Sequence, residues 1–189
     1  MLLGEHESAL RNLNIAWRLD PLSPSVQLLI GQAWYAARQY NIATAHLEAL
    51  QRENPSWIPV LYFLGMAYFH SGRLDEARTM LDSAVRADPQ TKHSLAGLAK
   101  THWQAGRELE ARDVFERLVS PKTQGSLSSC EVAEVLATFG DERGCIEWLR
   151  KAVDERCPDL AGLRVDPAYD VMRENADFQA IMDLVFGNA

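Results

Sequence analysis

The sequence has 189 residues and lacks any long apolar run. No stretch approaches the roughly 18–20 consecutive apolar residues that a membrane-spanning helix needs, and the N-terminus does not have the layout of a signal peptide. We therefore expect a cytoplasmic protein with no membrane partner. With 47% hydrophobic and 24% charged residues, the composition is typical of a folded globular chain.

An excess of positive charge is also lacking. The chain has 19 Lys and Arg against 26 Asp and Glu, which gives a net charge of −7. Proteins that coat nucleic acids need a concentrated basic surface to neutralise phosphates. The charge balance predicts no nucleic-acid partner for this segment.

Cysteines are few, and catalytic motifs are missing. The three cysteines form no CxxC pair, so we expect reduced thiols or small buried side chains at Cys130, Cys145 and Cys157. The sequence contains no phosphate-binding loop, dinucleotide fingerprint, zinc-protease motif or nucleophile elbow. The five histidines pair with no cysteine or carboxylate at metal-ligand spacing. We predict no enzymatic activity, no cofactor and no metal.

A repeat with a period of 34 residues runs through the chain. Prolines at helix-ending positions recur at this spacing, and glycines and alanines repeat it independently. Independent columns that share one period indicate a repeated structural unit. The columns are Pro21, Pro55 and Pro89; Gly72, Gly106 and Gly140; and Ala9, Ala43, Ala77 and Ala111.

Residues 58–89 show the unit most clearly. Its pattern is Leu61-x-x-Leu64-Gly65-x-x-Tyr68, Ala77-x-x-x-Leu81, Ala84 and Pro89. This pattern resembles the tetratricopeptide repeat (TPR). The resemblance implies an all-α fold, a right-handed superhelix of antiparallel helix pairs in which small residues occupy the crossing of each pair.

The repeat predicts an array over residues 1–159. Its units are residues 24–57, 58–91, 92–125 and 126–159, and an unpaired second helix at residues 5–20 precedes them. That helix leaves an apolar face uncovered, formed by Leu10, Leu13 and Trp17. Either the chain is the C-terminal piece of a longer protein, which we favour, or this helix packs against another subunit.

Local signals predict where several helices begin. Arg38 stands where the other units have a turn glycine, so we expect a slightly strained turn there, with Asn41 as the N-cap of the next helix. Ser23-Pro24 and Ser128-x-x-Glu131 are further signals for a helix start.

Residues 160–189 are predicted to form C-terminal capping helices. Asp166-Pro167 begins a short helix, and residues 176–186 have amphipathic spacing that would cover the last repeat. The apolar positions of that second helix are Phe178, Ile181, Met182, Val185 and Phe186. Residues 163–178 are similar to tails that close TPR arrays in bacterial multidomain regulators.

The TPR resemblance implies that the first helices of the units line a concave groove. Helical phase then predicts the groove positions Leu28, Gln32, Tyr35, Tyr62, Met66, Phe69, His70, His93, Lys100, Trp103 and Glu134. This surface is aromatic and has few positive groups, so it suits an apolar or amphipathic segment. The Lys and Asn positions with which some TPR domains clamp a chaperone carboxylate are not matched here.

These observations predict a non-catalytic protein-protein interaction module that binds a protein, peptide or helix in the groove, as part of a bacterial regulatory protein. Two alternatives are a small-ligand sensor that uses the aromatic groove, and a homo-oligomer formed through the uncovered N-terminal helix.

Overall fold

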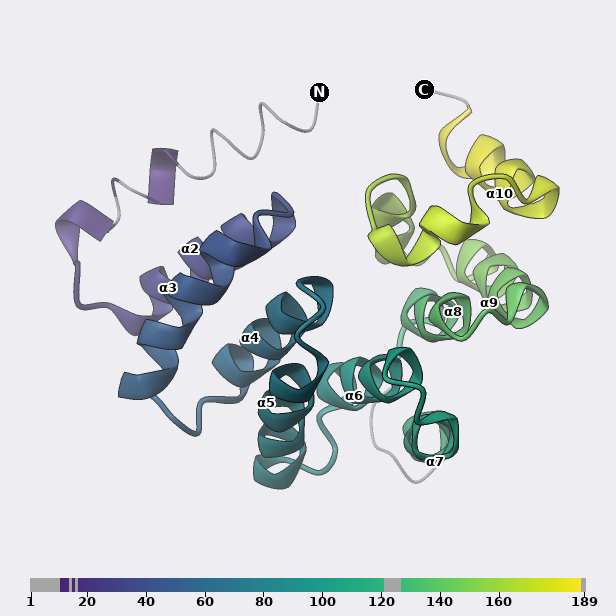
Figure 1. Cartoon of the computed structure of the whole chain (residues 1–189). Coiled ribbons are helices and arrows are strands. Elements are labelled where there is room, and N and C mark those ends of the chain that lie inside the picture. Colours follow the sequence, from purple (N-terminus) through teal and green to yellow (C-terminus); the bar gives the residue numbers. More distant parts are fainter. Residues whose placement is uncertain (1–10, 14, 16, 121–126, 188–189) are drawn as a thin grey trace. The chain divides into compact units, whose positions relative to one another are not determined.

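The computed structural model describes residues 11–13, 15, 17–120 and 127–187, and every regular element in these ranges is a helix (Figure 1). This confirms the predicted all-α fold. Residues 11–13, 15 and 17–19 are helical. The later elements are α2 (Pro24–Ala36), α3 (Tyr40–Glu53), α4 (Ile58–His70), α5 (Leu74–Ala87), α6 (Lys92–Gln104), α7 (Glu108–Val119), α8 (Ser129–Thr138), α9 (Glu142–Asp154), the 3-10 helices η1 (Pro158–Arg164) and η2 (Pro167–Met172), and α10 (Ala176–Phe186).

The chain divides into two compact units, residues 1–101 and residues 102–189, and the boundary lies within α6. In the first unit α2 packs on α3 and α4 on α5, and in the second α8 packs on α9. The division into an array of residues 1–159 and a cap of residues 160–189 stays a prediction. Ala9 and Leu10 lie outside the described residues.

The turns inside the helix pairs share one hydrogen-bond pattern. At Gly72, with φ of 76°, the Arg73 amide donates to the Tyr68 carbonyl over 2.9 Å. Arg38 makes the same turn with φ of 56°, and there the Gln39 amide donates to the Trp34 carbonyl over 2.9 Å. A left-handed conformation is unfavourable for a residue with a Cβ, which confirms the expected strain at Arg38.

The predicted helix starts are confirmed in two places and wrong in one. Pro24 is the first residue of α2, and Ser128 and Glu131 form a complete capping box at α8. Asn41 is not the N-cap of α3, because the helix already begins at Tyr40 and Gln39 occupies the cap position.

Small residues let the helices of each pair approach closely. A Cβ added to Gly65 on α4 would lie 2.7 Å from Cγ of Leu81 on α5, and 3.4 Å from the Ala77 carbonyl oxygen. Ala77 and Cys145 are both fully buried at the positions predicted for helix crossings. The repeat columns therefore mark the contacts that hold each pair together.

The C-terminal elements cover the α8–α9 pair. α10 packs on α9, η2 packs on α8, and Phe178 is fully buried in the shared core. The Tyr169 hydroxyl donates to the Cys130 carbonyl over 2.9 Å, which fastens η2 to α8. The tail thus packs on the α8–α9 pair, and α10 spans Ala176–Phe186.

Candidate functional site

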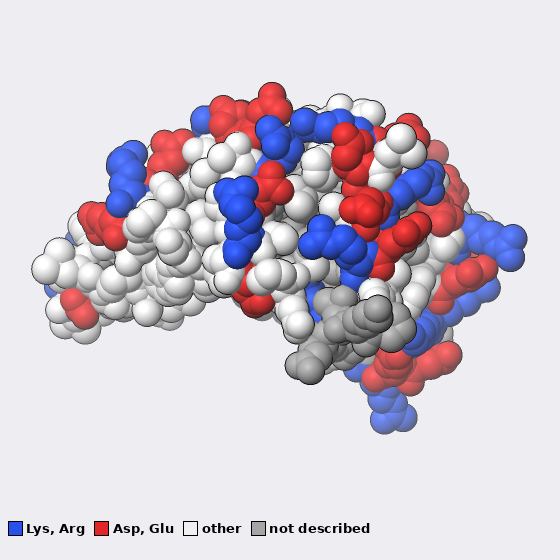
Figure 2. Space-filling model, turned by 90° about the horizontal axis from the view of Figure 1, so that it is seen from below, with Lys and Arg blue, Asp and Glu red and all other residues white. Residues whose placement is uncertain are grey.

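The first helices of residues 1–101 carry almost no charge. α2 and α4 contain no Asp, Glu, Lys or Arg, whereas α3 and α5 contain residues of both signs. Acidic and basic side chains are interspersed over the face shown in Figure 2. Among the helices α2 to α5, only α2 and α4 therefore offer a surface without acidic or basic side chains.

Seven rings form a connected series among the described residues of 1–101, and we call the six of them that are not buried the aromatic ladder. Tyr35 lies at its centre, with ring centroids 5.7 Å from Tyr40, 5.8 Å from Phe63 and 5.7 Å from His70. Phe63 continues the series to Tyr62 at 5.0 Å, and Tyr62 to His93 at 5.9 Å. The ladder joins helices α2, α3, α4 and α6 and consists of Tyr35, Tyr40, Tyr62, Phe63, His70 and His93.

His70 is held in the ladder on several sides. Its ring stacks on Tyr40 with centroids 4.8 Å apart and 13° between the planes, and its Nε2 lies 3.1 Å from the Tyr35 hydroxyl oxygen. Burial lowers the pKa of His70 to about 4, and the positive charges of Lys100 and Arg38 act in the same direction. The imidazole is therefore neutral at pH 7.

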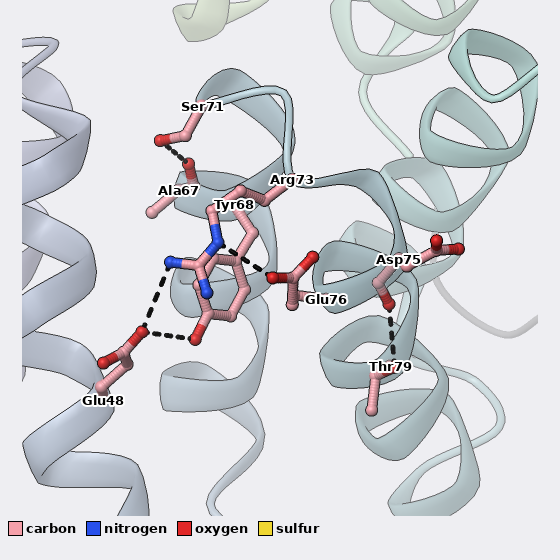
Figure 3. A network of polar contacts seen from close by, with 8 residues as sticks. All are labelled: Glu48, Ala67, Tyr68, Ser71, Arg73, Asp75, Glu76 and Thr79. Atoms are coloured by element: carbon pink, nitrogen blue, oxygen red, sulfur yellow. Dashed lines mark hydrogen bonds and ion pairs between the residues drawn. The ribbon is translucent and has the colours of Figure 1, made fainter.

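A polar network fixes α3 against α4 (Figure 3). The Tyr68 hydroxyl donates to Glu48 Oε1 over 2.7 Å, and the Arg73 guanidinium lies 4.3 Å from the centroid of the Tyr68 ring. Arg73 also lies 3.6 Å from Glu48 and donates to Glu76 over 3.0 Å. Burial and the bond to Glu48 raise the pKa of Tyr68 to about 12. Figure 3 shows one network that joins three helices.

Four of the predicted groove residues are buried, so the expectation that they face a ligand is wrong. Leu28 and Met66 are 8% and 1% exposed. A Cβ added at Gly97 on α6 would lie 2.8 Å from the Met66 sulfur, so this side chain fills the space that the glycine leaves. Leu28 belongs to α2, which contacts both α3 and α4. Neighbouring first helices thus cover positions that helical phase alone assigns to the groove.

Phe69 and Lys100 are the other two buried positions, at 7% and 4% exposure. The Phe69 ring meets the edge of His70 at 5.0 Å, and the Lys100 ammonium lies 5.9 Å from the Phe69 centroid. The lysine expected as a positive handle on the groove surface is instead packed against an aromatic ring.

The remaining predicted residues are at least partly accessible. Gln32, Tyr35, Tyr62 and His70 are half-buried and His93 is exposed, all within residues 1–101. Trp103 and Glu134 are half-buried and belong to residues 102–189.

Trp103 packs within its own unit. Its ring stacks on Phe139 at 4.5 Å, and the Arg112 guanidinium lies 5.3 Å from its centroid. One face of Trp103 therefore packs against its own unit, and the ladder connects Tyr35, Tyr62, His70 and His93 without it.

Sequence reasoning missed Tyr40 and Phe63. Tyr40 is the first residue of a second helix, so a count of first-helix positions passes over it. Phe63 lies between two predicted groove positions on α4. An aromatic residue directly after the turn at Arg38 was the available signal, since that turn brings it back beside α2.

Two surface cavities lie elsewhere. One of about 410 Å³ is lined by Trp17, Pro21, Gln27, Ile30 and His46. The other, of about 480 Å³, is lined by residues of α9 and by Asn175 and Asp177. Neither of these two cavities contains a residue that was predicted for the groove.

The described ranges contain neither a metal-binding cluster nor a membrane-spanning helix. Within residues 11–13, 15, 17–120 and 127–187, no group of three or more His, Cys, Asp or Glu is placed to hold a metal ion. In the same part of the chain, no helix combines the length and the apolar character that a membrane span requires.

Comparison with known proteins identifies the repeat. The tetratricopeptide repeat family matches residues 35–92 and 62–126. No curated protein matches the chain.

Solved structures share the fold at low sequence identity. A thermophilic TPR protein, TTC0263 from Thermus thermophilus, has a TM-score of 0.69 and 17% identity over 96% of this chain and 92% of its own. MamA from residue 41 to its end, from Desulfovibrio magneticus RS-1, has a TM-score of 0.59 and 22% identity over 66% and 71%. A tetratricopeptide repeat protein from Parabacteroides merdae ATCC 43184 has a TM-score of 0.57 and 16% identity over 98% and 74%.

The fold and the repeat together define an all-α protein built from helix pairs. Residues 35–126 match the tetratricopeptide repeat, and the chain has the fold of TPR proteins.

Proposed function

We propose that the chain is a non-catalytic protein-interaction module and that the aromatic ladder binds an apolar or amphipathic peptide or helix. The observation that carries the proposal is the connected ring series of residues 1–101, whose central rings Tyr35 and Tyr62 are half-buried on helices without carboxylates. TPR arrays characteristically bind proteins, which supports the same function.

The ladder has the properties of a pre-ordered binding surface. Ring contacts and the hydrogen bond between His70 and Tyr35 already hold the side chains in place. Little side-chain entropy is then lost on binding, and exposed aromatic faces supply the apolar area that anchors a partner. Because His70 is neutral at pH 7, its ring adds no charge that would have to be desolvated.

The proposal is tested with peptides selected by display on the full chain, with affinity measured by fluorescence polarisation. Tyr62→Ala should weaken binding by about 2 kcal/mol, or roughly 30-fold, as expected for an aromatic anchor. Leu109→Ala is the matched control, because Leu109 is 83% exposed on the second helix α7. Equal affinities for the two variants would contradict the proposed site.

A second candidate function is self-association through the N-terminal helical residues. Ile15, Trp17 and Leu19 are 58%, 44% and 83% exposed, which is unusual for a run of large apolar side chains. Sedimentation should then show a dimer that Trp17→Glu dissociates, whereas a monomeric wild-type chain would exclude this function. A place in a bacterial multidomain regulator stays a prediction from the tail.

A further inference from the structure

The rings of the aromatic ladder combine apolar faces with polar edges. Three of them are tyrosines and two are histidines, so only Phe63 lacks a hydroxyl group or a ring nitrogen. Tyr35, Tyr40 and Tyr62 are half-buried, and His93 is exposed. A ligand that covers these rings has to pack against their faces and also offer hydrogen-bonding groups to their edges, because a polar group buried without a partner weakens a complex.

A helical ligand would meet only the first of these two requirements. An α-helix uses its backbone N–H and C=O groups in its own hydrogen bonds, so its apolar face presents side chains alone. A polyproline II helix has no internal hydrogen bonds, and its carbonyl groups can accept from hydroxyl and imidazole donors. Proline-rich segments in this conformation dock on aromatic-lined grooves, and their stiffness limits the entropy lost on binding. The polar ring edges therefore favour an extended, proline-rich ligand over a helix.

The spacing of two tyrosine rings suits such a ligand. The Tyr35 and Tyr62 rings both meet the Phe63 ring edge-on, with centroids 5.8 Å and 5.0 Å from it and planes inclined to it by 74° and 73°. The two tyrosine rings are thus at most about 11 Å apart, and prolines three residues apart in a polyproline II helix are separated by about 9 Å. One turn of the ligand can therefore reach both tyrosines.

The charges of the first helices indicate which side chains the ligand lacks. Helices α2, α4 and α6 contain no Asp or Glu, and their only Lys and Arg residues are Lys92 and Lys100 on α6. Burial lowers the pKa of His70, and the positive charges of Lys100 and Arg38 lower it further. A basic peptide would find no carboxylate on these three helices and would be repelled by Lys100 and Arg38. Charge complementarity thus disfavours a ligand with Lys or Arg.

We propose that the peptide bound at the aromatic ladder is an uncharged, proline-rich segment in the polyproline II conformation. Two of its prolines, three residues apart, pack on the rings of Tyr35 and Tyr62, and its carbonyl groups accept hydrogen bonds from the polar ring edges. This inference rests on the proposed function, since it names the class of peptide that the same surface binds.

The test compares dye-labelled L-decaproline with its mirror image, D-decaproline, by fluorescence polarisation on the full chain. The two peptides have the same composition, apolarity and stiffness, but their helices have opposite hands. L-decaproline should bind at least about tenfold more tightly than D-decaproline, and its affinity should change little between low and high salt. Equal affinities for the two peptides, or an affinity for L-decaproline that falls steeply with salt, would overturn the proposal.

Two variants locate the bound peptide. Tyr62→Ala should weaken the binding of L-decaproline at least about tenfold, because it removes one of the two rings that contact proline. Leu109→Ala should leave the affinity unchanged, since Leu109 is 83% exposed on α7. Equal affinities of the two variants for L-decaproline would also overturn the proposal. The comparison of L- and D-decaproline on the wild-type chain decides the matter even if Tyr62→Ala fails to fold.

The display-selected peptides separate this inference from the proposed function. If Tyr62→Ala weakens their binding while L-decaproline does not bind the wild-type chain, the ladder binds another class of peptide and only the proline-rich assignment fails. The same conclusion holds if circular dichroism shows that the selected peptides become helical when they bind. If Tyr62→Ala and Leu109→Ala bind the selected peptides equally, the proposed function fails as well.

Discussion

Two sets of contacting aromatic side chains, one in each compact unit, differ in how far they are exposed. In residues 102–189, Tyr169 and Phe178 stack at 5.7 Å and are 3% and 0% exposed beneath the chain's own C-terminal elements. In residues 1–101, Tyr35 and Tyr62 both contact Phe63, with ring centroids 5.8 Å and 5.0 Å away, yet both stay half-buried. The covered rings build a core, and the partly open rings offer a surface.

The difference indicates which unit retains accessible aromatic area that a partner could bury. A solenoid must cover the apolar edge of its last repeat, and this chain does so with η1, η2 and α10. The first helices α2 and α4 have no charged groups that would keep their accessible face solvated.

Ala77→Glu should produce the largest effect, because it places a carboxylate in a helix crossing where Ala77 is fully buried. An uncompensated buried charge costs about 3–5 kcal/mol. Urea unfolding followed by circular dichroism measures the loss. Ala45→Glu is the control, since Ala45 is exposed on α3. Similar stabilities of the two variants would mean that α4 and α5 do not cross at Ala77.

Phe178→Ala should destabilise the capped unit by about 3–4 kcal/mol, the usual cost of deleting a buried phenylalanine side chain. Leu184→Ala on the same helix should cost little, because Leu184 is 65% exposed. Amide hydrogen exchange would show whether α8 and α9 lose protection while α2–α5 keep theirs. Unchanged protection of α9 would contradict the capping role of α10.

His70 should make residues 1–101 sensitive to acid. Its folded pKa of about 4 lies below the ordinary value of 6.5, so the folded state binds fewer protons between these values. The contribution of the neutral His70 side chain to the free energy of unfolding is complete above pH 6.5. It is lost as the pH falls toward 4, by at most about 3 kcal/mol. His70→Gln should flatten the dependence of the unfolding free energy on pH in this range. If the unfolding free energy of the variant depends on pH as steeply as that of the wild type, His70 is not buried in its neutral form.

Tyr68→Phe should have the smallest effect on stability. It removes the hydroxyl that donates to Glu48, which costs about 1–2 kcal/mol in urea unfolding. The folded pKa of Tyr68 is raised to about 12, so the wild-type contribution is complete below pH 10 and is lost between pH 10 and 12. If the variant loses the same stability over that range, another group titrates there.

The fold could be predicted from the sequence because a few positions determine it. The 34-residue columns mark helix crossings and turns, and Gly65, Ala77 and Gly72 occupy those places in the structure. The bounds of α10 followed from its amphipathic spacing, and in the structure the side chain of Asn175 caps the helix. The N-cap of α3 could not be found in this way, because Gln39 makes no side-chain capping bond.

The site was predicted only in part. Helical phase identified Tyr35, Tyr62, His70 and His93, but it cannot tell the groove from the contact between neighbouring first helices. Met66 shows the difficulty, since the glycine that makes room for it lies on α6 and its own helix gives no sign of this. Tyr40 was missed because its place in the ladder depends on the turn at Arg38 and on a second helix.

The proposed peptide site is tested most directly by photo-cross-linking. A benzoylphenylalanine placed at position 62, and in a matched chain at position 109, is irradiated with a display-selected peptide, and the products are mapped by mass spectrometry. Cross-linking from position 62 that excess unlabelled peptide abolishes, with none from position 109, is the predicted result. Equal cross-linking from both positions, or none from position 62 for a peptide that binds, would contradict binding at the aromatic ladder.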